Sequence, residues 1–378
     1  MKSATKILLV CLLGALSFFV FLPPRQNENE AVETAFGDDS VLCLNTAESE
    51  DVKISSRLWE LLFGKSDETT DSKDERKTLL IGGSVFGAKI RQSYVSVSDP
   101  MDVSELRAGD RIISANGSDI GSPADIKRIV KECGGSDINL VCMRDGKTVN
   151  LSIKPKEIDG EYRLGVALKD GAAGIGTITY VDPESGEFGG LGHGICDTDT
   201  GDVIEMEVGE VTGVILGGVK KGESGKPGEL SGILTDKVTG VLYSNTECGV
   251  FGTLNNIPSA LNSEAVEVAH RDEVHTGEAT IFSTVKMGAR KEFKIEITEI
   301  NKSSKGTKSF KIRVTDPALI AVTGGVVRGM SGSPIMQDGK LVGAVTHVMI
   351  NEPTEGYGIF IENMLNASAA HNESPKAA

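Results

Sequence analysis

One serine near the C-terminus has the neighbours of a catalytic nucleophile. Ser331 lies in the segment Val326-Val-Arg-Gly-Met-Ser-Gly-Ser-Pro-Ile335, between Gly329 and Gly332. Glycines allow a tight turn with positive φ, in which the N–H groups of Gly329 and Ser331 can converge as an oxyanion hole. A glycine–serine surface turn is the alternative interpretation. The neighbouring Ser333 is a weaker candidate, because the proline that follows it has no N–H to donate.

A serine nucleophile needs a base within hydrogen-bond reach, and the chain has five histidines. His193 lies among glycines in Phe188-Gly-Gly-Leu-Gly-His-Gly-Ile195, where the backbone is open to a close neighbour. We therefore predict His193 as the base. His347, on an apolar strand after the serine, is the second candidate and fits a half-buried structural histidine equally well. The other three histidines lie in charged or polar segments: His270, His275 and His371.

The group that orients the base has several candidates. Asp316 ends a predicted strand in Val314-Thr-Asp-Pro317, shortly before Ser331. A second set of carboxylates follows His193 and also fits a polar turn: Asp197, Asp199 and Asp202. The residues alone leave this choice open.

The cysteines point away from thiol and metal chemistry. Cys196 follows His193 by three residues, but in an extended segment their side chains point to opposite faces, so a thiol nucleophile is disfavoured. None of the six cysteines forms a C-x-x-C pair, which argues against a zinc site or a redox motif. We expect mostly buried free thiols, and neither a metal nor a cofactor.

Short strands with glycine turns must position these side chains. Glycine contributes 45 of 378 residues, and long helical periodicity is absent from residues 157–366. Residues 292–300 and 309–316 alternate apolar and polar side chains, which predicts two strands joined by residues 301–308. A body of this length and texture is mainly β and fits one large barrel or two small ones.

Residues 79–156 have an order of elements that differs from the rest of the chain. The segment Ala108-Gly-Asp-Arg-Ile-Ile-Ser-Ala-Asn-Gly117 predicts a turn, a strand and a hairpin turn. Ser122 and Pro123 begin a helix, and a hairpin turning at Asp145-Gly146 follows. This order resembles a PDZ domain, and such domains bind a peptide as an added strand. A small β-domain without a ligand is the alternative. The resemblance places peptide binding on the loop and strand start at Gly82, Gly83, Ser84 and Phe86.

The N-terminus predicts export. Residues 1–25 carry two lysines before an apolar run that ends at Pro23-Pro24, which is typical of a signal sequence or a short membrane anchor. Residues 26–78 are acidic and polar and form a solvated linker with a possible self-cleavage site. Residues 367–378 form a polar tail. The net charge of −15 argues against a nucleic-acid partner.

The motifs in their order resemble the stage IV sporulation protein B family of spore-forming bacteria. Matching segments include Leu191-Gly-His-Gly-Ile195, Val314-Thr-Asp-Pro317 and Gly324-Gly-Val-Val-Arg-Gly-Met-Ser-Gly-Ser-Pro-Ile335. The resemblance implies a serine peptidase with a PDZ domain and a trypsin-like double β-barrel. It also implies a triad with His193 as base, Asp316 as orienting acid and Ser331 as nucleophile.

The same resemblance implies a role in sporulation. The family protein is exported into the space between the forespore and mother-cell membranes, where it is anchored at least initially. Its expected partners are its own N-terminal segment, which it cleaves, and the regulator of an intramembrane metalloprotease, whose cleavage leads to activation of a late mother-cell sigma factor. The alternative function is a membrane-anchored PDZ adaptor with a degenerate, non-catalytic peptidase body.

Overall fold

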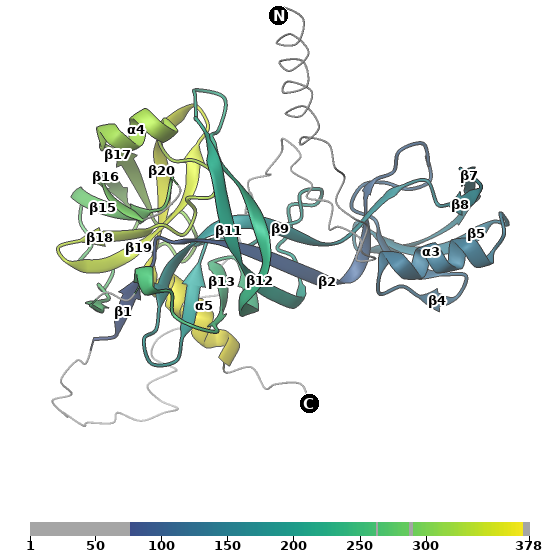
Figure 1. The fold of residues 1–378 in the computed structure, drawn as a ribbon, viewed down its shortest axis with the longest axis horizontal. Helices are drawn as coiled ribbons and strands as arrows, with labels where there is room; N and C mark the ends of the chain where they lie inside the picture. The colour runs from purple at the N-terminus through teal and green to yellow at the C-terminus, as the bar shows by residue number, and fades with distance from the viewer. Residues whose placement is uncertain (1–75, 262–263, 287–289, 373–378) are drawn as a thin grey trace, which may run out of the picture. The chain divides into compact units, whose positions relative to one another are not determined.

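The computed structural model describes residues 76–261, 264–286 and 290–372 (Figure 1). The predicted anchor over residues 1–25 and nearly all of the acidic linker lie outside these ranges. Within them, no helix has the length and apolar character to cross a membrane. Helix α5 (Ile361–Asn372) extends into the predicted polar tail, so part of that tail is helical.

The C-terminal barrel is a closed ring of six antiparallel strands. Alternating side chains of its second strand, Phe293, Ile295 and Ile297, are buried in its core, as the sequence pattern predicts. Short helix α4 (Pro317–Thr323) follows the third strand. Around the ring the strands are β15 (Gly277–Ser283), β16 (Lys291–Ile300), β17 (Phe310–Val314), β20 (Glu352–Phe360), β19 (Lys340–Met349) and β18 (Pro334–Gln337).

A second ring of six strands precedes the first in the chain. Its closure depends on the antiparallel pairing of β2 with β9, which begins at Val85 opposite Thr177. Phe86 and Phe188 meet edge to face in its core, with ring centroids 5.6 Å apart. The described residues therefore form two small barrels rather than one large one. Around this ring the strands are β2 (Val85–Asp99), β9 (Ala167–Val181), β10 (Glu187–Gly190), β13 (Gly249–Leu254), β12 (Glu229–Thr246) and β11 (Met206–Lys220).

The PDZ-like module has a hydrophobic core of its own. Helix α3 (Pro123–Glu132) begins where predicted, and Asp125 accepts a hydrogen bond from the backbone N–H of Ser122 at 3.0 Å. Asp145 and Gly146 have φ of 49° and 70°, as a tight hairpin turn requires. The module also contains β3 (Arg111–Ala115), β4 (Ser118–Asp119), β5 (Ile138–Arg144) and β6 (Lys147–Ile153), followed by the pair β7 (Lys156–Ile158) and β8 (Glu161–Arg163).

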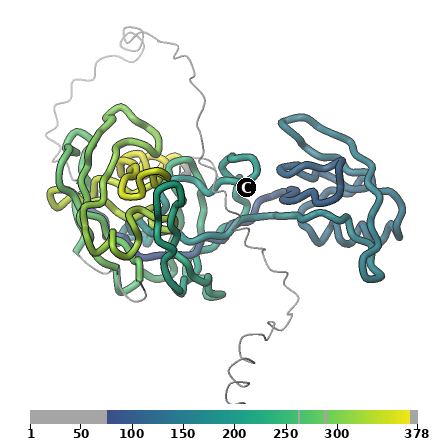
Figure 2. Tube along the Cα trace, turned by 90° about the horizontal axis from the view of Figure 1, so that it is seen from above, coloured from purple at the N-terminus to yellow at the C-terminus, as the bar shows by residue number. Residues whose placement is uncertain are grey.

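The predicted start of this module, at residue 79, is wrong. Strand β1 (Thr78–Ile81) pairs with β9 and with β14 (Val266–Glu267). Strand β2 pairs with β11 as far as Gln92 and continuously with β9 as far as Arg91. The module's core begins only at Val95. The module is therefore inserted into the first barrel between β2 and β9, whose long strands lead into it in Figures 1 and 2.

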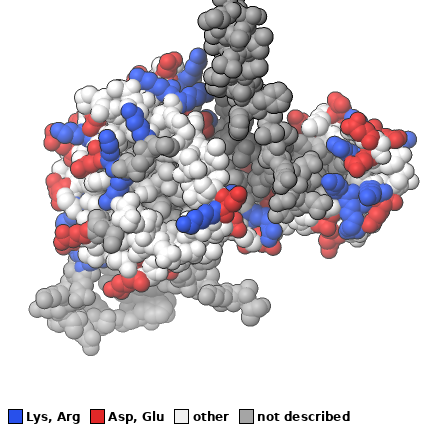
Figure 3. Space-filling view, viewed as in Figure 1, with Lys and Arg blue, Asp and Glu red and all other residues white. Residues whose placement is uncertain are grey.

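A further hydrophobic cluster combines residues of both barrels. Tyr180 and Phe251 from the first barrel and Leu79 from β1 share it with Met336 and Ile359 from the second barrel. Residues of α5 also belong to this cluster. The last described element is the short helix η1 (Ser259–Leu261). On the face shown in Figure 3, the basic and acidic side chains that remain visible are interspersed, without an extended basic surface.

Candidate active site

One cavity brings the predicted nucleophile and the predicted base together. Its volume is about 640 Å³, and its lining includes Ser331 and His193. His193 follows β10 of the first barrel, whereas Ser331 precedes β18 of the second. His347, Arg328 and Gly329 line the same cavity. Residues far apart in the chain thus meet because each barrel contributes one loop.

The backbone around Ser331 leaves two N–H groups free. In a trans peptide the C=O and N–H point in opposite directions. The C=O of Arg328 accepts a hydrogen bond from the Leu230 N–H at 2.9 Å, and that of Met330 accepts one from the Ser333 N–H at 2.9 Å. The N–H groups of the next residues, Gly329 and Ser331, have no acceptor in the described part of the chain. These two unpaired donors next to the hydroxyl are the groups that could form an oxyanion hole.

Strand β9 fixes the same turn from the other side. The Thr177 hydroxyl donates to the Gly329 carbonyl at 2.8 Å, and the Thr179 hydroxyl donates to the Gly332 carbonyl at 2.8 Å. The Thr177 N–H donates to the Ser331 carbonyl at 3.0 Å. Both glycines have φ of 92°, and a Cβ on Gly332 would lie 2.0 Å from the Thr177 carbonyl oxygen. Both turn positions therefore require glycine.

The Ser331 hydroxyl does not contact His193 in this structure. Its Oγ donates to the carbonyl oxygen of Thr346 at 2.8 Å. The Thr346 hydroxyl in turn donates to the Thr307 carbonyl at 2.8 Å. Transfer of the hydroxyl proton to His193 therefore requires Oγ to turn from Thr346 toward the imidazole. Catalytic hydrogen bonds often tighten only when substrate binds.

His193 is held as a neutral imidazole. Its Nδ1 lies 2.8 Å from the carbonyl oxygen of Gly194, and because a carbonyl only accepts, Nδ1 carries the proton and Nε2 the lone pair. Burial lowers the pKa of His193, and the hydrogen bond to Gly194 only partly offsets this. The base is therefore unprotonated at neutral pH, as proton abstraction requires.

A second histidine lies beside the base. The rings of His193 and His347 have centroids 5.2 Å apart and planes tilted by 37°. Burial, followed by His193 and Lys308, lowers the pKa of His347 to about 3. Its Nδ1 is buried and has no hydrogen-bond partner among the described residues. The expectation of a half-buried histidine is confirmed, but its place against His193 was not anticipated.

Asp316 has a structural task in this conformation. It is the N-cap of α4: its Oδ1 accepts hydrogen bonds from the N–H groups of Ala318 at 2.8 Å and Leu319 at 3.1 Å. Partial burial raises the pKa of Asp316, but hydrogen bonds from Leu319, Lys294 and Ala318 outweigh it and the net pKa is lowered. Asp316 does not line the cavity, so the structure does not bring it to His193. The Asp-Pro pair that begins a helix was a capping signal in the sequence.

The carboxylates after His193 form a polar turn, which was the alternative to a role in orienting the base. Asp197 accepts hydrogen bonds from the N–H of Asp199 at 2.8 Å and from the Lys169 ammonium at 2.8 Å. Its neighbour Cys196 is disulfide-bonded and offers no thiolate. The remaining described cysteines are free thiols: Cys133, Cys142 and Cys248.

The predicted peptide-binding loop of the PDZ-like module is wrong. Gly82, Gly83 and Ser84 join β1 to β2 within the barrel region. The Gly83 N–H donates to the Ile178 carbonyl at 2.7 Å, and a Cβ on Gly82 would overlap that carbonyl. Phe86 is buried in the core of the first barrel. These residues are part of the barrel and not of the inserted module, because β2 pairs with β9 from Val85 and with β11 from Gly87.

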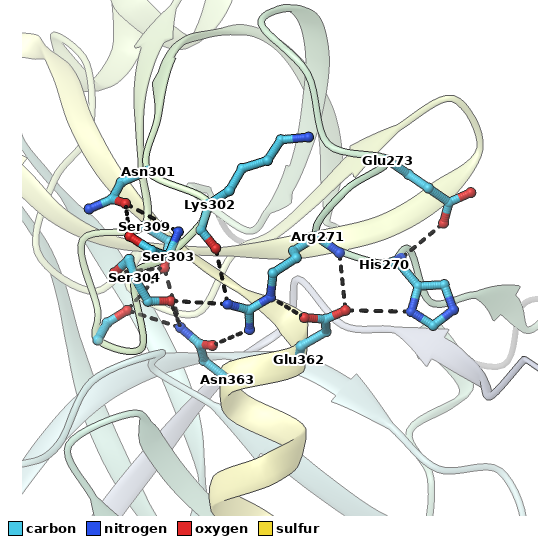
Figure 4. Close-up of polar contacts among 11 residues, drawn as sticks. His270, Arg271, Glu273, Asn301, Lys302, Ser303, Ser304, Ser309, Glu362 and Asn363 are labelled. Atoms are coloured by element: carbon cyan, nitrogen blue, oxygen red, sulfur yellow. Dashed lines mark hydrogen bonds and ion pairs between the residues drawn. The ribbon is translucent and has the colours of Figure 1, made fainter. Parts of the chain in front are cut away.

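A polar network builds one wall of the cavity. The segment 301–309 joins β16 to β17, and its Thr307 lines the cavity. Arg271 lies at the centre of the contacts in Figure 4, where its guanidinium binds Glu362 at 2.5 Å and Asn363 at 2.9 Å. The side chains of Arg271 and Asn363 also donate hydrogen bonds to backbone carbonyls of this segment, namely those of Lys302, Ser304 and Gly306.

Comparison with known families identifies the chain. The model of the SpoIVB peptidase S55 family matches residues 160–365, more than half of the chain. The chain belongs to this family of serine peptidases. A PDZ-domain model matches residues 66–154, which includes the segment that the structure assigns to the first barrel. The catalytic body and the inserted module of this S55 peptidase are thus both recognised.

Curated relatives share only part of the chain. A protein that carries the name of a zinc metalloprotease in Brucella suis biovar 1 is 33% identical over 108 residues, which is 28% of each protein. One with the same kind of name in Lactococcus lactis subsp. lactis is 41% identical over 64 residues, 16% of this chain and 14% of its own length. This chain therefore spans less than a third of the length of these relatives.

Solved structures with some similarity include a protease. The inactive form of the Rv3671c protease is 14% identical, with a TM-score of 0.31 and coverage of 52% of this chain and 83% of the other. A serine-to-alanine mutant of Rv3671c from M. tuberculosis H37Rv is 13% identical, with a TM-score of 0.32 and coverage of 54% and 84%.

Proposed function

We propose that this serine peptidase uses Ser331 as nucleophile and His193 as base. Oγ of Ser331 bonds to the scissile carbonyl carbon, and its proton passes to Nε2 of His193. That proton then goes to the leaving amine, and water releases the acyl group by the reverse path. The N–H groups of Gly329 and Ser331 stabilise the oxyanion. The observation that carries the proposal is that both N–H groups lack an acceptor while both residues line the cavity with His193.

Asp316 is the proposed orienting acid, and the structure sets a condition on this role. Its carboxylate caps α4, while the Gly194 carbonyl holds Nδ1 of His193. To act on His193, Asp316 must exchange the N–H donors of the helix for the imidazole. A change of this kind on substrate binding would couple substrate to assembly of the triad.

The proposed biological role is signalling in sporulation. The match to the SpoIVB peptidase family supports it. The sequence shared with proteins named as zinc metalloproteases supports a connection with such a protease, whose regulator is the proposed substrate. We further propose that the chain is exported, is anchored at its N-terminus at least initially, acts between the forespore and mother-cell membranes, and cleaves its own acidic segment within residues 26–78.

Matched variants test this function. We expect Ser331→Ala and His193→Ala to abolish peptide cleavage and self-cleavage, which mass spectrometry of the N-termini would show, while circular dichroism stays that of a folded protein. Ser333→Ala is the control, because the Ser333 hydroxyl bonds Ser283 in the barrel core at 3.1 Å. Cleavage by Ser331→Ala at the wild-type rate would reject the assignment.

The second candidate is the non-catalytic PDZ adaptor. One observation favours it: the Ser331 hydroxyl bonds the Thr346 carbonyl rather than a base. An adaptor would support sporulation with Ser331→Ala but would fail when the inserted module is deleted, whereas a peptidase fails in the first test.

A further inference from the structure

One cation in the cavity has no side-chain partner among the residues that the structure describes. Arg328 is the only Lys or Arg among the described residues that line the cavity, and it is half-buried. Its guanidinium makes no ion pair or hydrogen bond within the described ranges, although other arginines there, such as Arg271 and Arg144, do. The backbone of Arg328 is fixed, because its N–H donates to the Gly228 carbonyl at 2.9 Å and its carbonyl accepts from Leu230.

The acidic residues of the same cavity do not neutralise this charge. Asp197 is paired with Lys169. Asp202 and Glu247 also line the cavity, but they are exposed to solvent and form no ion pair with Arg328 among the described residues. Removing water from a guanidinium without giving it an anion is costly, and the Arg328 residue is only partly exposed. A carboxylate that arrives with a ligand can offset this cost, because it matches the fork of the guanidinium with two charge-assisted hydrogen bonds.

We propose that Arg328 binds a substrate carboxylate and makes the peptidase selective for an Asp or Glu side chain near the scissile bond. Arg328 directly precedes Gly329, the oxyanion donor, and lies three residues before Ser331. A carboxylate bound there lies within a few residues of the bond that Ser331 attacks. This inference rests on the proposed function, since it takes Ser331 as the nucleophile.

The chain itself contains a stretch of the required chemistry. The segment Ser66-Asp-Glu-Thr-Thr-Asp-Ser-Lys-Asp-Glu-Arg76 lies in the acidic linker that is the proposed site of self-cleavage. A peptide of this sequence is therefore the first substrate to try. The preference itself is independent of where the chain cuts itself.

The test compares pairs of peptides that differ only in Glu against Gln at one position on either side of a cleaved bond. For the full chain we expect kcat/KM to be at least about tenfold higher for Glu at one position, as a partly desolvated charge-assisted hydrogen bond implies. Arg328→Gln should bring that ratio close to one. Arg328→Glu should reverse the preference in favour of Lys at the same position. A merely structural role of Arg328 would lower cleavage of both peptides alike.

The matched control is Arg163→Gln, which removes the same charge from an exposed strand outside the cavity. It should leave the Glu-to-Gln ratio unchanged. An unchanged ratio in Arg328→Gln, in an enzyme that still cleaves peptides, would overturn the inference while the proposed function stands.

Binding separates the two claims if no peptide is cleaved. Ser331→Ala and the double variant Ser331→Ala/Arg328→Gln are titrated with the labelled peptide of residues 66–76 by fluorescence anisotropy. At least about tenfold weaker binding by the double variant supports the carboxylate site even if catalysis fails. Equal affinity rejects it.

Discussion

Thr177 gives a sharp test of how the oxyanion hole is held. Its hydroxyl donates to the Gly329 carbonyl, which belongs to the peptide unit between the two free N–H donors. Thr177→Val keeps the shape of the side chain and removes this hydrogen bond. The peptide unit after Gly329 can then rotate, and the N–H groups of Gly329 and Ser331 no longer converge reliably on one point.

The expected magnitude follows from the geometry. In Thr177→Val the partly buried Gly329 carbonyl loses the hydroxyl donor of a fully buried threonine, which costs about 1–3 kcal/mol of stability. Complete loss of one oxyanion donor lowers kcat by about 10²–10³. Because the donor in Thr177→Val is loosened and not deleted, we expect kcat to fall by about 10- to 100-fold. The interaction matters mainly in the transition state, so KM should change little.

Steady-state kinetics with a cleaved peptide, together with thermal unfolding, measures both effects. The matched control is Thr179→Val, which removes a hydrogen bond of the same 2.8 Å length from an equally buried threonine to the Gly332 carbonyl, beyond the two donors. It should lose similar stability but retain most of its kcat. Thr177→Ser restores the hydroxyl and should rescue kcat. If Thr177→Val and Thr179→Val lower kcat equally, the reasoning is refuted.

Three further outcomes are expected. Asp316→Asn should keep the α4 cap and therefore the stability, but it removes the orienting carboxylate and should lower kcat by about 10⁴. Asp316→Ala should in addition lose about 1 kcal/mol of stability in a denaturant titration. Full activity of Asp316→Asn would limit the role of Asp316 to capping. Because burial lowers the pKa of His193 below 6.5, the acidic limb of kcat/KM should lie below pH 6.5, and a limb above 7 would contradict a buried base. The pKa of His347 is about 3 in the folded state, whereas an unperturbed histidine has a pKa of 6.5. As the pH drops below 6.5, His347 therefore gains a proton in the unfolded chain but not in the folded one. The free energy of unfolding should fall between pH 6.5 and 3, by up to about 2 kcal/mol at pH 5. His347→Phe should weaken this pH dependence of the unfolding midpoint, and an unchanged slope would speak against it.

Local backbone structure could be predicted from the sequence. The Asp145-Gly146 turn, the start of α3 at Pro123 and the alternation in β16 each depend on neighbouring residues alone, and the structure has all three. The glycines beside Ser331 likewise predicted positive φ, and both have it. Short-range signals of this kind do not need the rest of the fold.

Contacts between strands and loops far apart in the chain could not be predicted from the sequence. Strand β2 is continuous over 15 residues, so no turn in its sequence marks where the barrel ends and the inserted module begins. The peptide-binding loop was misplaced for the same reason. The stacking of His347 on His193 joins two barrels, and no local pattern encodes it. The free N–H groups depend on β9 and β12, which precede Ser331 by many residues.

Covalent labelling tests the central claim most directly. The full chain is treated with an organophosphorus fluoride, which phosphorylates an activated serine hydroxyl and releases fluoride, and the adduct is located by peptide mass spectrometry. The account predicts a single adduct on Ser331, absent from Ser331→Ala and formed much more slowly in His193→Ala. An adduct on another residue, or equal labelling of Ser331→Ala, would contradict it.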